Sequence, residues 1–395
     1  MNAAIQTGEK LIEAGRFQEA RDYFEGLSMT PVAATEAHVW LGKINLAMVR
    51  TNQAREHIEA ALHREPNNLG ALVLRGQYHI FRNEYEEALA SIETARALDP
   101  SLADVYPNLS TCYRELGRRE EAVEYARKGV ELLPAKAHAH FALALALGAT
   151  GRIADSLREA AATIRLAPDH LPAYLYAGEI NRKAGQTDVV IELYEAGVRL
   201  NPWFQPLRET LVEVYIERDD YEHALHHALE VALRDGAPRT LNVAGYCARL
   251  ANQAGVAESA FRSAIVRNPE NWLSCFLLGD LYLDAGDYAR AEPALRRSAE
   301  LNPQAWQPRN ALGTLLMRSG RAAEGEQVLR QAMELAPSAP APPLQLARRF
   351  AATGRKTEAM ILAYKAFEHA GPDVDLREEA SRLLRALSDG TETVH

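Results

Sequence analysis

Histidine pairs and a glycine-led turn are the features of this sequence that come nearest to metal-binding or catalytic motifs. His223 and His227 are four residues apart, a spacing that brings two imidazoles to one face of a helix and suits Zn²⁺. No HExxH pattern or nearby cysteine completes such a site, so we expect these two histidines and His226 to face solvent, with a zinc site as the weaker alternative. Residues 354–357, Gly-Arg-Lys-Thr, lack the upstream glycine of a phosphate-binding loop. We therefore expect no metal ion, no cofactor and no catalytic site.

A run of glutamates at helical spacing is the more promising candidate for a binding surface. Glu209, Glu213 and Glu217 follow one another at i, i+4 and i+8, which places them on one face of a helix. Like charges at this spacing destabilise an isolated helix by about 0.3 kcal/mol per pair. Two interpretations remain open: a solvated face partly neutralised by neighbouring arginines, or a surface that attracts the Arg or Lys side chains of a partner.

The overall composition narrows the classes of function. The net charge of −9 repels phosphate backbones, so nucleic acid is not expected as a partner. No stretch approaches the roughly 18 apolar residues of a membrane helix, and the N-terminal residues lack the pattern of a signal peptide. Membrane insertion is therefore not expected, and a cytoplasmic location is. Cys112, Cys247 and Cys275 are far apart and form no CxxC, which predicts buried free thiols.

Prolines mark a repeat that would position these residues. A step of 34 residues is kept by Pro66, Pro100, Pro134, Pro168 and Pro202 and, after one unit that is a residue short, by Pro269, Pro303 and Pro337. A small residue recurs in the same phase, at Gly8, Gly42, Gly76, Ser110, Ala144, Gly178, Val212, Gly245, Gly279, Gly313 and Ala347. Such residues let two antiparallel helices approach closely, and a proline ends the second helix of each pair.

Two more positions repeat with the small slot. Alanine recurs twelve residues after it, as in Ala54 and Ala291, and a turn residue such as Gly286 lies midway. Glycine suits the positive φ found at helix C-termini. The seventh unit departs from the pattern, because Val212 fills the small slot and Asp219 the turn slot, and such local departures often mark a strained or functional place.

The two clearest units are residues 74–100 and 277–303, the latter reading LLGDLYLDAGDYARAEPALRRSAELNP. Their order of Leu-Gly, Tyr, Ala, Ala and Pro resembles the tetratricopeptide repeat family. The resemblance covers about residues 1–372 and implies an all-α fold, a right-handed superhelical solenoid of about eleven helix hairpins whose first helices line a concave groove. The implied units are approximately 1–34, 35–68, 69–102, 103–136, 137–170, 171–204, 205–237, 238–271, 272–305, 306–339 and 340–372.

The repeat pattern stops after residue 372. Asp373 can cap a last helix, expected at 373–388, that carries Leu376, Leu383 and Leu387 on one side. Such a helix would shield the apolar face of the final repeat. A disordered tail is expected at 389–395.

The resemblance also implies where a partner would bind, because exposed positions of first helices face the groove in this family. The acidic and aromatic residues at these positions are Glu179, Glu209, Glu213, Glu217, Tyr246, Phe276, Asp280 and Asp284. Together they predict an acidic surface flanked by aromatic rings, which suits an extended or helical peptide with basic residues. The basic clamp with which some family members hold a C-terminal carboxylate is not matched, since only Lys43 fits it.

The function implied by the resemblance is a non-catalytic scaffold or adaptor that binds a partner protein or peptide in the concave groove. An alternative is a regulatory or assembly subunit of a bacterial multiprotein complex, for example in polysaccharide or pilus biogenesis. A third alternative is an enzyme or small-ligand receptor. The ends of a solenoid can also stack on a second copy, which would give self-association.

Overall fold

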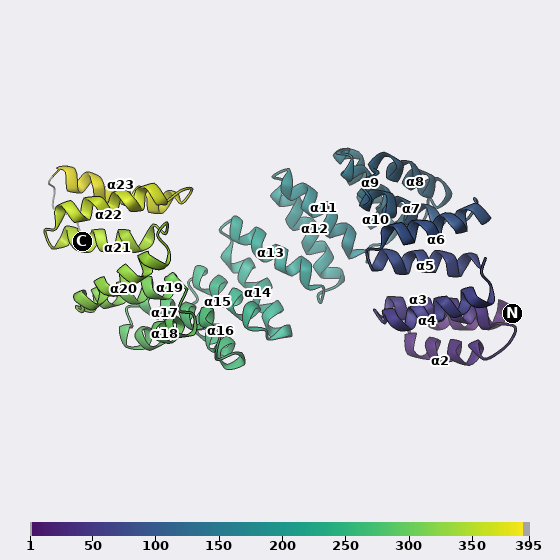
Figure 1. The fold of residues 1–395 in the computed structure, drawn as a ribbon, viewed down its shortest axis with the longest axis horizontal. Helices are drawn as coiled ribbons and strands as arrows, with labels where there is room; N and C mark the ends of the chain where they lie inside the picture. The colour runs from purple at the N-terminus through teal and green to yellow at the C-terminus, as the bar shows by residue number, and fades with distance from the viewer. Residues whose placement is uncertain (1, 390–395) are drawn as a thin grey trace. The chain divides into compact units, whose positions relative to one another are not determined.

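The fold is built from α-helices alone in the part of the chain that the computed structural model describes, residues 2–389. Within this range twenty-three helices follow one another, and the first twenty-two form eleven helix pairs (Figure 1). The predicted all-α fold of helix hairpins with one extra C-terminal helix is confirmed. The chain forms two compact units, unit 1 ending at Phe204 and unit 2 beginning at Gln205.

Unit 1 holds the first six helix pairs. Its helices are α1 (Asn2–Glu13), α2 (Phe17–Ser28), α3 (Ala34–Ala47), α4 (Thr51–Arg64), α5 (Leu69–Phe81), α6 (Tyr85–Leu98), α7 (Val105–Glu115), α8 (Arg119–Leu132), α9 (Ala137–Ala149), α10 (Ile153–Leu166), α11 (Leu171–Lys183) and α12 (Thr187–Leu200).

Unit 2 holds the remaining five pairs and the last helix. Its helices are α13 (Gln205–Glu217), α14 (Tyr221–Asp235), α15 (Pro238–Leu250), α16 (Ala254–Arg267), α17 (Trp272–Asp284), α18 (Tyr288–Leu301), α19 (Trp306–Arg318), α20 (Ala322–Leu335), α21 (Ala341–Ala352), α22 (Lys356–His369) and α23 (Val374–Asp389).

The turn inside each pair has one geometry throughout. At Gly286 the backbone is left-handed, with φ of +74°; its N–H donates to Leu283 O at 3.1 Å, and the N–H of Asp287 donates to Tyr282 O at 2.9 Å. These two bonds satisfy carbonyls that the end of the first helix leaves open. All residues of the turn slot have positive φ: Gly15, Val49, Asn83, Gly117, Gly151, Gly185, Asp219, Asn252, Gly286, Gly320 and Gly354.

The small slot is matched by the residue sixteen positions later, on the second helix of the pair. A Cβ built on Gly178 would lie 2.1 Å from Tyr194 Cε1, and one on Gly245 would lie 2.5 Å from Phe261 Cε1. Four more glycines of the slot face the residue sixteen positions later in the same way: Gly8 faces Phe24, Gly76 faces Ile92, Gly279 faces Leu295 and Gly313 faces Leu329. At Gly42 the nearest atom is Leu74 Cδ2 of the next pair, at 2.7 Å, and Ile58 Cγ1 lies at 3.4 Å.

Where the slot is not glycine, the matching residue is small. The pairs are Ser110 with Ala126, Ala144 with Ala160, Val212 with Ala228 and Ala347 with Ala363. Val212 is 5 % exposed and Ala228 is 2 % exposed, so both belong to the core of unit 2. In the seventh pair the larger side chain is on the first helix and the smaller one is on the second, the reverse of the glycine pairs. The departure from the pattern at Val212 is therefore compensated within the pair.

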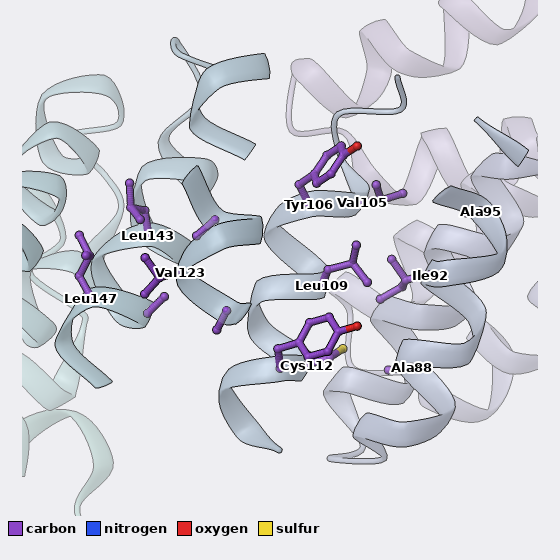
Figure 2. Close-up of a cluster of buried hydrophobic side chains, with 14 of the residues drawn as sticks. Ala88, Ile92, Ala95, Val105, Tyr106, Leu109, Cys112, Val123, Leu143 and Leu147 are labelled. Carbon is purple, nitrogen blue, oxygen red and sulfur yellow. The ribbon is translucent and has the colours of Figure 1, made fainter. Parts of the chain in front are cut away.

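The core of each unit runs along the stacked helices. In unit 1, Ile92 of α6, Leu109 and Cys112 of α7 and Leu143 of α9 belong to one buried cluster (Figure 2). All three cysteines are buried free thiols, as predicted. Burial raises the pKa of the Cys112 thiol to about 12, so this group is an unreactive part of the core.

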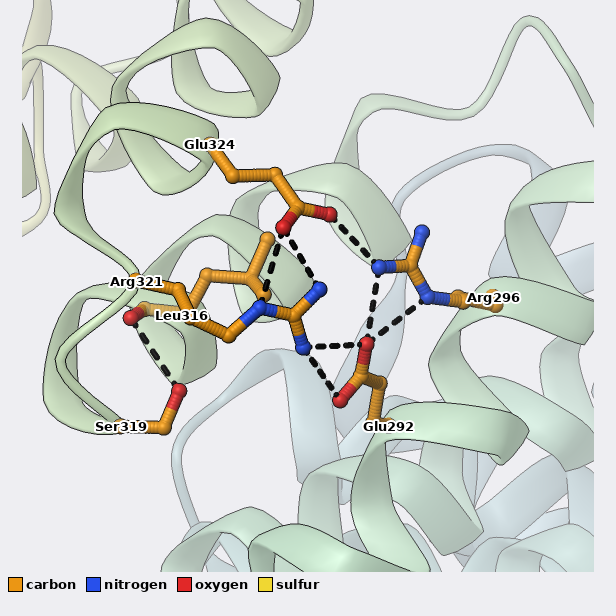
Figure 3. A network of polar contacts seen from close by, with 6 residues as sticks. All are labelled: Glu292, Arg296, Leu316, Ser319, Arg321 and Glu324. Atoms are coloured by element: carbon orange, nitrogen blue, oxygen red, sulfur yellow. Dashed lines mark hydrogen bonds and ion pairs between the residues drawn. The ribbon is translucent and has the colours of Figure 1, made fainter.

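Ion pairs link successive second helices on the surface of unit 2. Arg321 Nη1 lies 2.8 Å from both carboxylate oxygens of Glu292, and Arg296 Nη2 lies 2.8 Å from Glu292 Oε1 and 2.7 Å from Glu324 Oε1 (Figure 3). Glu292 and Arg296 belong to α18, Glu324 belongs to α20, and Arg321 lies in the turn between α19 and α20. The network therefore joins neighbouring repeats.

The last helix, α23, covers the final repeat. Ala380 and Leu387 are buried against residues of α21 and α22, including Leu344 and Phe350. Asp373 accepts a hydrogen bond from the Leu376 N–H at 3.0 Å, which is the predicted cap. The tail expected at 389–395 lies, from residue 390 onward, outside the described residues.

Candidate functional site

The first helices α13, α15 and α17 of unit 2 carry seven of the eight residues that the sequence singled out. On α13, Glu213 and Glu217 are exposed, and Glu209 is half-buried and accepts a hydrogen bond from Gln205 Nε2 at 2.8 Å. The three carboxylates follow the helix at the predicted spacing. This helix therefore presents negative charge along its accessible side.

Arg249 of α15 links that helix to the aspartates of α17. Its Nη1 donates to Asp280 Oδ2 at 2.7 Å and to Asp284 Oδ2 at 3.3 Å. The same guanidinium lies 5.7 Å from the ring centre of Tyr246. The acidic character expected at α17 is thus offset by a cation on the neighbouring repeat, and the sequence pattern did not reveal this pairing.

The environment of Asp280 disfavours its charged form. Burial raises the pKa of this carboxyl above its ordinary value, the charge of Asp284 adds to the rise, and Arg249 opposes it. Burial is the largest of these effects, so the ion pair with Arg249 only partly offsets the lost hydration.

Apolar side chains lie on α15 and α17. Tyr246 and Val243 of α15 are each 38 % exposed, and Leu273 of α17 is 39 % exposed. Phe276 of α17 is half-buried. Sequence reasoning named Tyr246 and Phe276 but missed Val243 and Leu273.

Asn242 of α15 has an unusual side chain for a buried position. The residue is 5 % exposed, and neither Nδ2 nor Oδ1 has a hydrogen-bond partner. Leaving a buried polar group unpaired costs about 1–3 kcal/mol. The equivalent position of the first helix two repeats later holds Asn310, whose Oδ1 is also buried without a partner. Apolar residues occupy this position in other repeats, namely Val39, Val73 and Phe276.

Glu179, the eighth predicted residue, belongs to unit 1. It lies on α11, where its Oε1 is 3.3 Å from Lys183 Nζ one turn later. The structure thus groups the other seven residues within unit 2 and places Glu179 in the other unit.

The prediction that the histidine cluster faces solvent is wrong for one member. His223 and His226 are exposed, but His227 is 2 % exposed. Its ring stacks on Tyr215 with 5.7 Å between ring centres, and Arg208 Nη1 lies 3.2 Å from its Nδ1. Partners on α13 therefore hold this imidazole in the core, and helical spacing alone could not show it.

A hollow lies in unit 1 beside α8, with a volume of about 600 Å³. Its charged lining balances three carboxylates against three cations, and the full lining is Tyr106, Glu120, Val123, Glu124, Tyr125, Arg127, Lys128, Glu131 and Arg152. This balance gives the hollow no preference for a charged ligand.

Two further properties concern the whole described chain. Residues 2–389 contain no group of three or more His, Cys, Asp or Glu side chains arranged to bind a metal ion. Within the same range, no helix has the length and hydropathy needed to cross a membrane.

Comparison with known proteins gives relatives over parts of the chain. The chain is 28 % identical over 138 residues to DnaJ homolog subfamily C member 3 of Gallus gallus, an alignment that covers 33 % of this chain and 27 % of that protein. It is 23 % identical over 216 residues to the BBSome complex member BBS4 homolog of Drosophila melanogaster, covering 46 % of this chain and 44 % of the relative. The chain thus spans less than half the length of these relatives.

A solved structure and a family model agree on the fold. The C-terminal part of a TPR repeat-containing protein from Cytophaga hutchinsonii superimposes with a TM-score of 0.51 at 16 % identity, covering 60 % of this chain and 98 % of that one. The tetratricopeptide repeat model matches residues 41–103, 73–137, 141–202 and 276–340, which together exceed half of the chain. The protein therefore belongs to the tetratricopeptide repeat family.

Proposed function

We propose that this protein is a non-catalytic scaffold that binds a partner protein or peptide on the first helices of unit 2. The binding residues are Glu209, Glu213, Glu217, Tyr246, Phe276, Asp280 and Asp284, and Glu179 offers similar chemistry on unit 1. The three free thiols are compatible with a reducing compartment such as the cytoplasm.

One observation carries this proposal: an accessible carboxylate row on α13 lies in the same unit as exposed apolar side chains on α15 and α17. Tyr246 and Leu273 expose more than a third of their surface, and Glu213 and Glu217 are exposed. A surface that combines apolar area with one sign of charge binds partners of opposite charge, because burial provides affinity and charge provides selectivity.

The proposal is tested by capturing partners from the cells that make the protein. The bait is the full chain, either wild type or Glu213→Lys/Glu217→Lys, which reverses the charge of α13. The control is Glu222→Lys/Glu300→Lys, which makes the same charge change at exposed sites on the second helices α14 and α18. We expect at least tenfold less partner on the α13 variant and an unchanged amount on the control, because like charges facing each other across an interface are strongly unfavourable.

Two results would count against the proposal. Equal recovery on all three baits would remove the unit 2 surface as the binding site. Recovery of no protein on any bait, under conditions that keep the chain folded, would argue against the scaffold function itself.

Membership in a larger assembly is a second candidate function, favoured by the names of two relatives. The Superkiller complex protein 3 of Mus musculus, 25 % identical over 120 residues, and the BBSome complex member are both named as parts of complexes. If this chain is a regulatory or assembly subunit, it should elute from a gel-filtration column in one stoichiometric complex when taken from native extract. An adaptor with exchanging partners would elute in several fractions with different partners, and a self-associated chain would elute as an oligomer without other proteins.

A further inference from the structure

His38 and His57 form a contact between two imidazoles in unit 1, away from the surface proposed above. His38 lies on α3 and His57 on α4, the two helices of the second pair, which pack side by side (Figure 1). Their Nδ1 atoms are 3.1 Å apart, and their ring centres are 5.3 Å apart. Both side chains are half-buried, so each keeps part of its surface in contact with solvent.

Other helix pairs place different groups at the same two positions. In the fifth pair, Nδ1 of His140 lies 2.7 Å from Glu159 Oε2, so that a base faces an acid. In the fourth pair, Tyr106 faces Tyr125 with 6.4 Å between ring centres. The second pair instead directs two basic nitrogens at each other. They can share one proton between them, because two N–H groups cannot donate to each other.

The surroundings keep these two imidazoles neutral. Burial lowers the pKa of His38, and the charges of His57 and Arg64 lower it further. Burial also lowers the pKa of His57, although the charges of Glu56 and Glu25 oppose the change. The neutral imidazole is the form that offers a lone pair to a metal ion. At pH 7 both rings are therefore in the form that can bind one.

The separation of the two Nδ1 atoms matches that of two ligands on one metal ion. Imidazole nitrogens lie roughly 2.0–2.1 Å from zinc, which puts two such ligands about 2.9 Å apart at a right angle and about 3.4 Å apart at the tetrahedral angle. The observed 3.1 Å falls between these two values. An ion at this point would take the place of the shared proton, and the ring that donated the proton would carry it on Nε2 instead.

The histidine pair that helical spacing suggested does not converge in this way. His223 and His227 each stack on the ring of Tyr215, with 5.1 and 5.7 Å between ring centres. Nδ1 of His223 lies 2.9 Å from the carboxylate of Asp220. Nδ1 of His227 lies 3.2 Å from Arg208 Nη1. The Nδ1 atoms of these two rings therefore point to different partners.

We propose that His38 and His57 form a binding site for one divalent transition-metal ion of the kind that prefers imidazole ligands, namely Zn²⁺, Ni²⁺ or Cu²⁺. The two Nδ1 atoms are the protein ligands, and water completes the coordination. Because one ligand comes from α3 and the other from α4, the ion links the two helices of the pair. Two protein ligands are fewer than the four of a closed zinc site, so the ion exchanges with solvent, and its effect on stability follows its concentration.

The test uses the full-length protein without a histidine tag and each metal ion alone, beginning with Cu²⁺, which binds nitrogen ligands most tightly. Affinity is measured by isothermal titration calorimetry on wild type, His57→Gln and His140→Gln. Glutamine at position 57 keeps a polar side chain facing His38 but removes one ligand. His140 is the matched control, because it occupies the position equivalent to His38 in the fifth pair and faces a carboxylate.

We expect the strongest site to have equal affinity on wild type and His140→Gln, and to be at least tenfold weaker on His57→Gln. Pulsed electron paramagnetic resonance of bound Cu²⁺ should show two imidazole nitrogens on wild type and one on His57→Gln. Addition of the ion should slow hydrogen exchange in α3 and α4 and leave α9 and α10 unchanged. Affinity for wild type should fall as the pH is lowered, because protons compete for the same lone pairs.

Two outcomes would overturn the inference. Equal affinity of wild type and His57→Gln would mean adventitious binding only, at other histidines of the chain. No binding of the three ions to folded wild type would mean that a shared proton alone joins the two rings. If His57→Gln lowers the thermal midpoint, His38→Gln takes its place, since it removes the other ligand and should weaken the ion by a similar factor.

These outcomes are independent of the capture experiment on Glu213 and Glu217, which concerns unit 2.

Discussion

At the scale of single residues, Val49 shows a local conflict between sequence and backbone. It occupies the turn slot with φ of +59°, a left-handed conformation that a β-branched side chain strongly disfavours, and 66 % of its surface is exposed. Replacing it removes little packing and relieves the strain. We expect Val49→Gly to raise the free energy of unfolding by about 1 kcal/mol, measured by urea denaturation followed by circular dichroism.

The converse substitution supplies the control for Val49. Gly117 fills the same slot with φ of +79° and has open space around a Cβ, so Gly117→Val should lower stability by a similar amount through the backbone alone. Unchanged or reduced stability of Val49→Gly would show that the left-handed turn carries no strain at that position.

Asp280 gives a prediction about pH. Its folded pKa is raised by burial, so the folded state binds this proton more tightly than the unfolded state does. Wild-type stability therefore includes an unfavourable contribution at neutral pH that disappears as pH falls through the folded pKa. We expect Asp280→Asn to have a higher free energy of unfolding than wild type at pH 7. Arg249 keeps Asp284 as its partner in this variant. The difference in stability should shrink as the pH is lowered towards 3.8, the ordinary pKa of an Asp carboxyl.

The measurement for Asp280 is the urea midpoint of both proteins between pH 4 and pH 8. Glu222→Gln is the control, because that carboxylate is exposed and is not among the charges that shift the pKa of Asp280. A difference between Asp280→Asn and wild type that stays constant over the whole range would mean that the buried carboxyl titrates as it does in the unfolded chain.

At the scale of helices, the pairs were predictable because the information is local. The small slot, the turn slot and the proline act within one repeat, so their periods predicted the hairpins and the positive φ of the glycines in the turn slot. The side chains that join different helices were not predictable in this way. The pairing of Arg249 with Asp280 and the burial of His227 depend on which atoms of neighbouring helices meet, and helical periodicity carries no signal for that.

One feature between helices was readable from the sequence. The small slot and the residue sixteen positions later vary together, glycine with a large residue and alanine or valine with alanine, as in Gly245 with Phe261 and Val212 with Ala228. The total volume at the contact is thereby kept similar from pair to pair.

This volume matching predicts coupling between the two positions. Phe261→Ala leaves a cavity and should destabilise by about 3–5 kcal/mol, and Gly245→Ala puts a methyl group against the Phe261 ring. In the double variant the new methyl group fills part of the cavity. The resulting pair, alanine with alanine, is the one that Ala144 and Ala160 form at the same two positions. We expect the double variant to be more stable than the sum of the single effects by about 1–2 kcal/mol, from a double-mutant cycle of urea midpoints.

Additive effects at Gly245 and Phe261 would contradict the volume matching. A control cycle uses Gly245→Ala with Phe24→Ala, two positions that belong to different units. Their effects should add within about 0.5 kcal/mol, because distant sites with no shared partner are independent.

At the scale of the whole molecule, contacts follow the order of the chain. The main helix–helix contacts in residues 2–389 join helices that are adjacent or next but one in sequence, such as α17 with α18 and α7 with α9. A structure held together in this way has a stability that is a sum of repeats and their interfaces, and it can open in one region while the rest stays folded.

This arrangement predicts that destabilisation stays local. Phe24 is fully buried in the first repeat, and Phe24→Ala should open a cavity there that costs about 3–5 kcal/mol. By hydrogen exchange with mass spectrometry we expect faster exchange in α1–α4 and unchanged protection in α15–α20. Phe261→Ala should give the reverse pattern, with α1–α4 unchanged. Equal acceleration of every helix by either variant would mean that the two units unfold in one cooperative step, and stability could then not be a local sum.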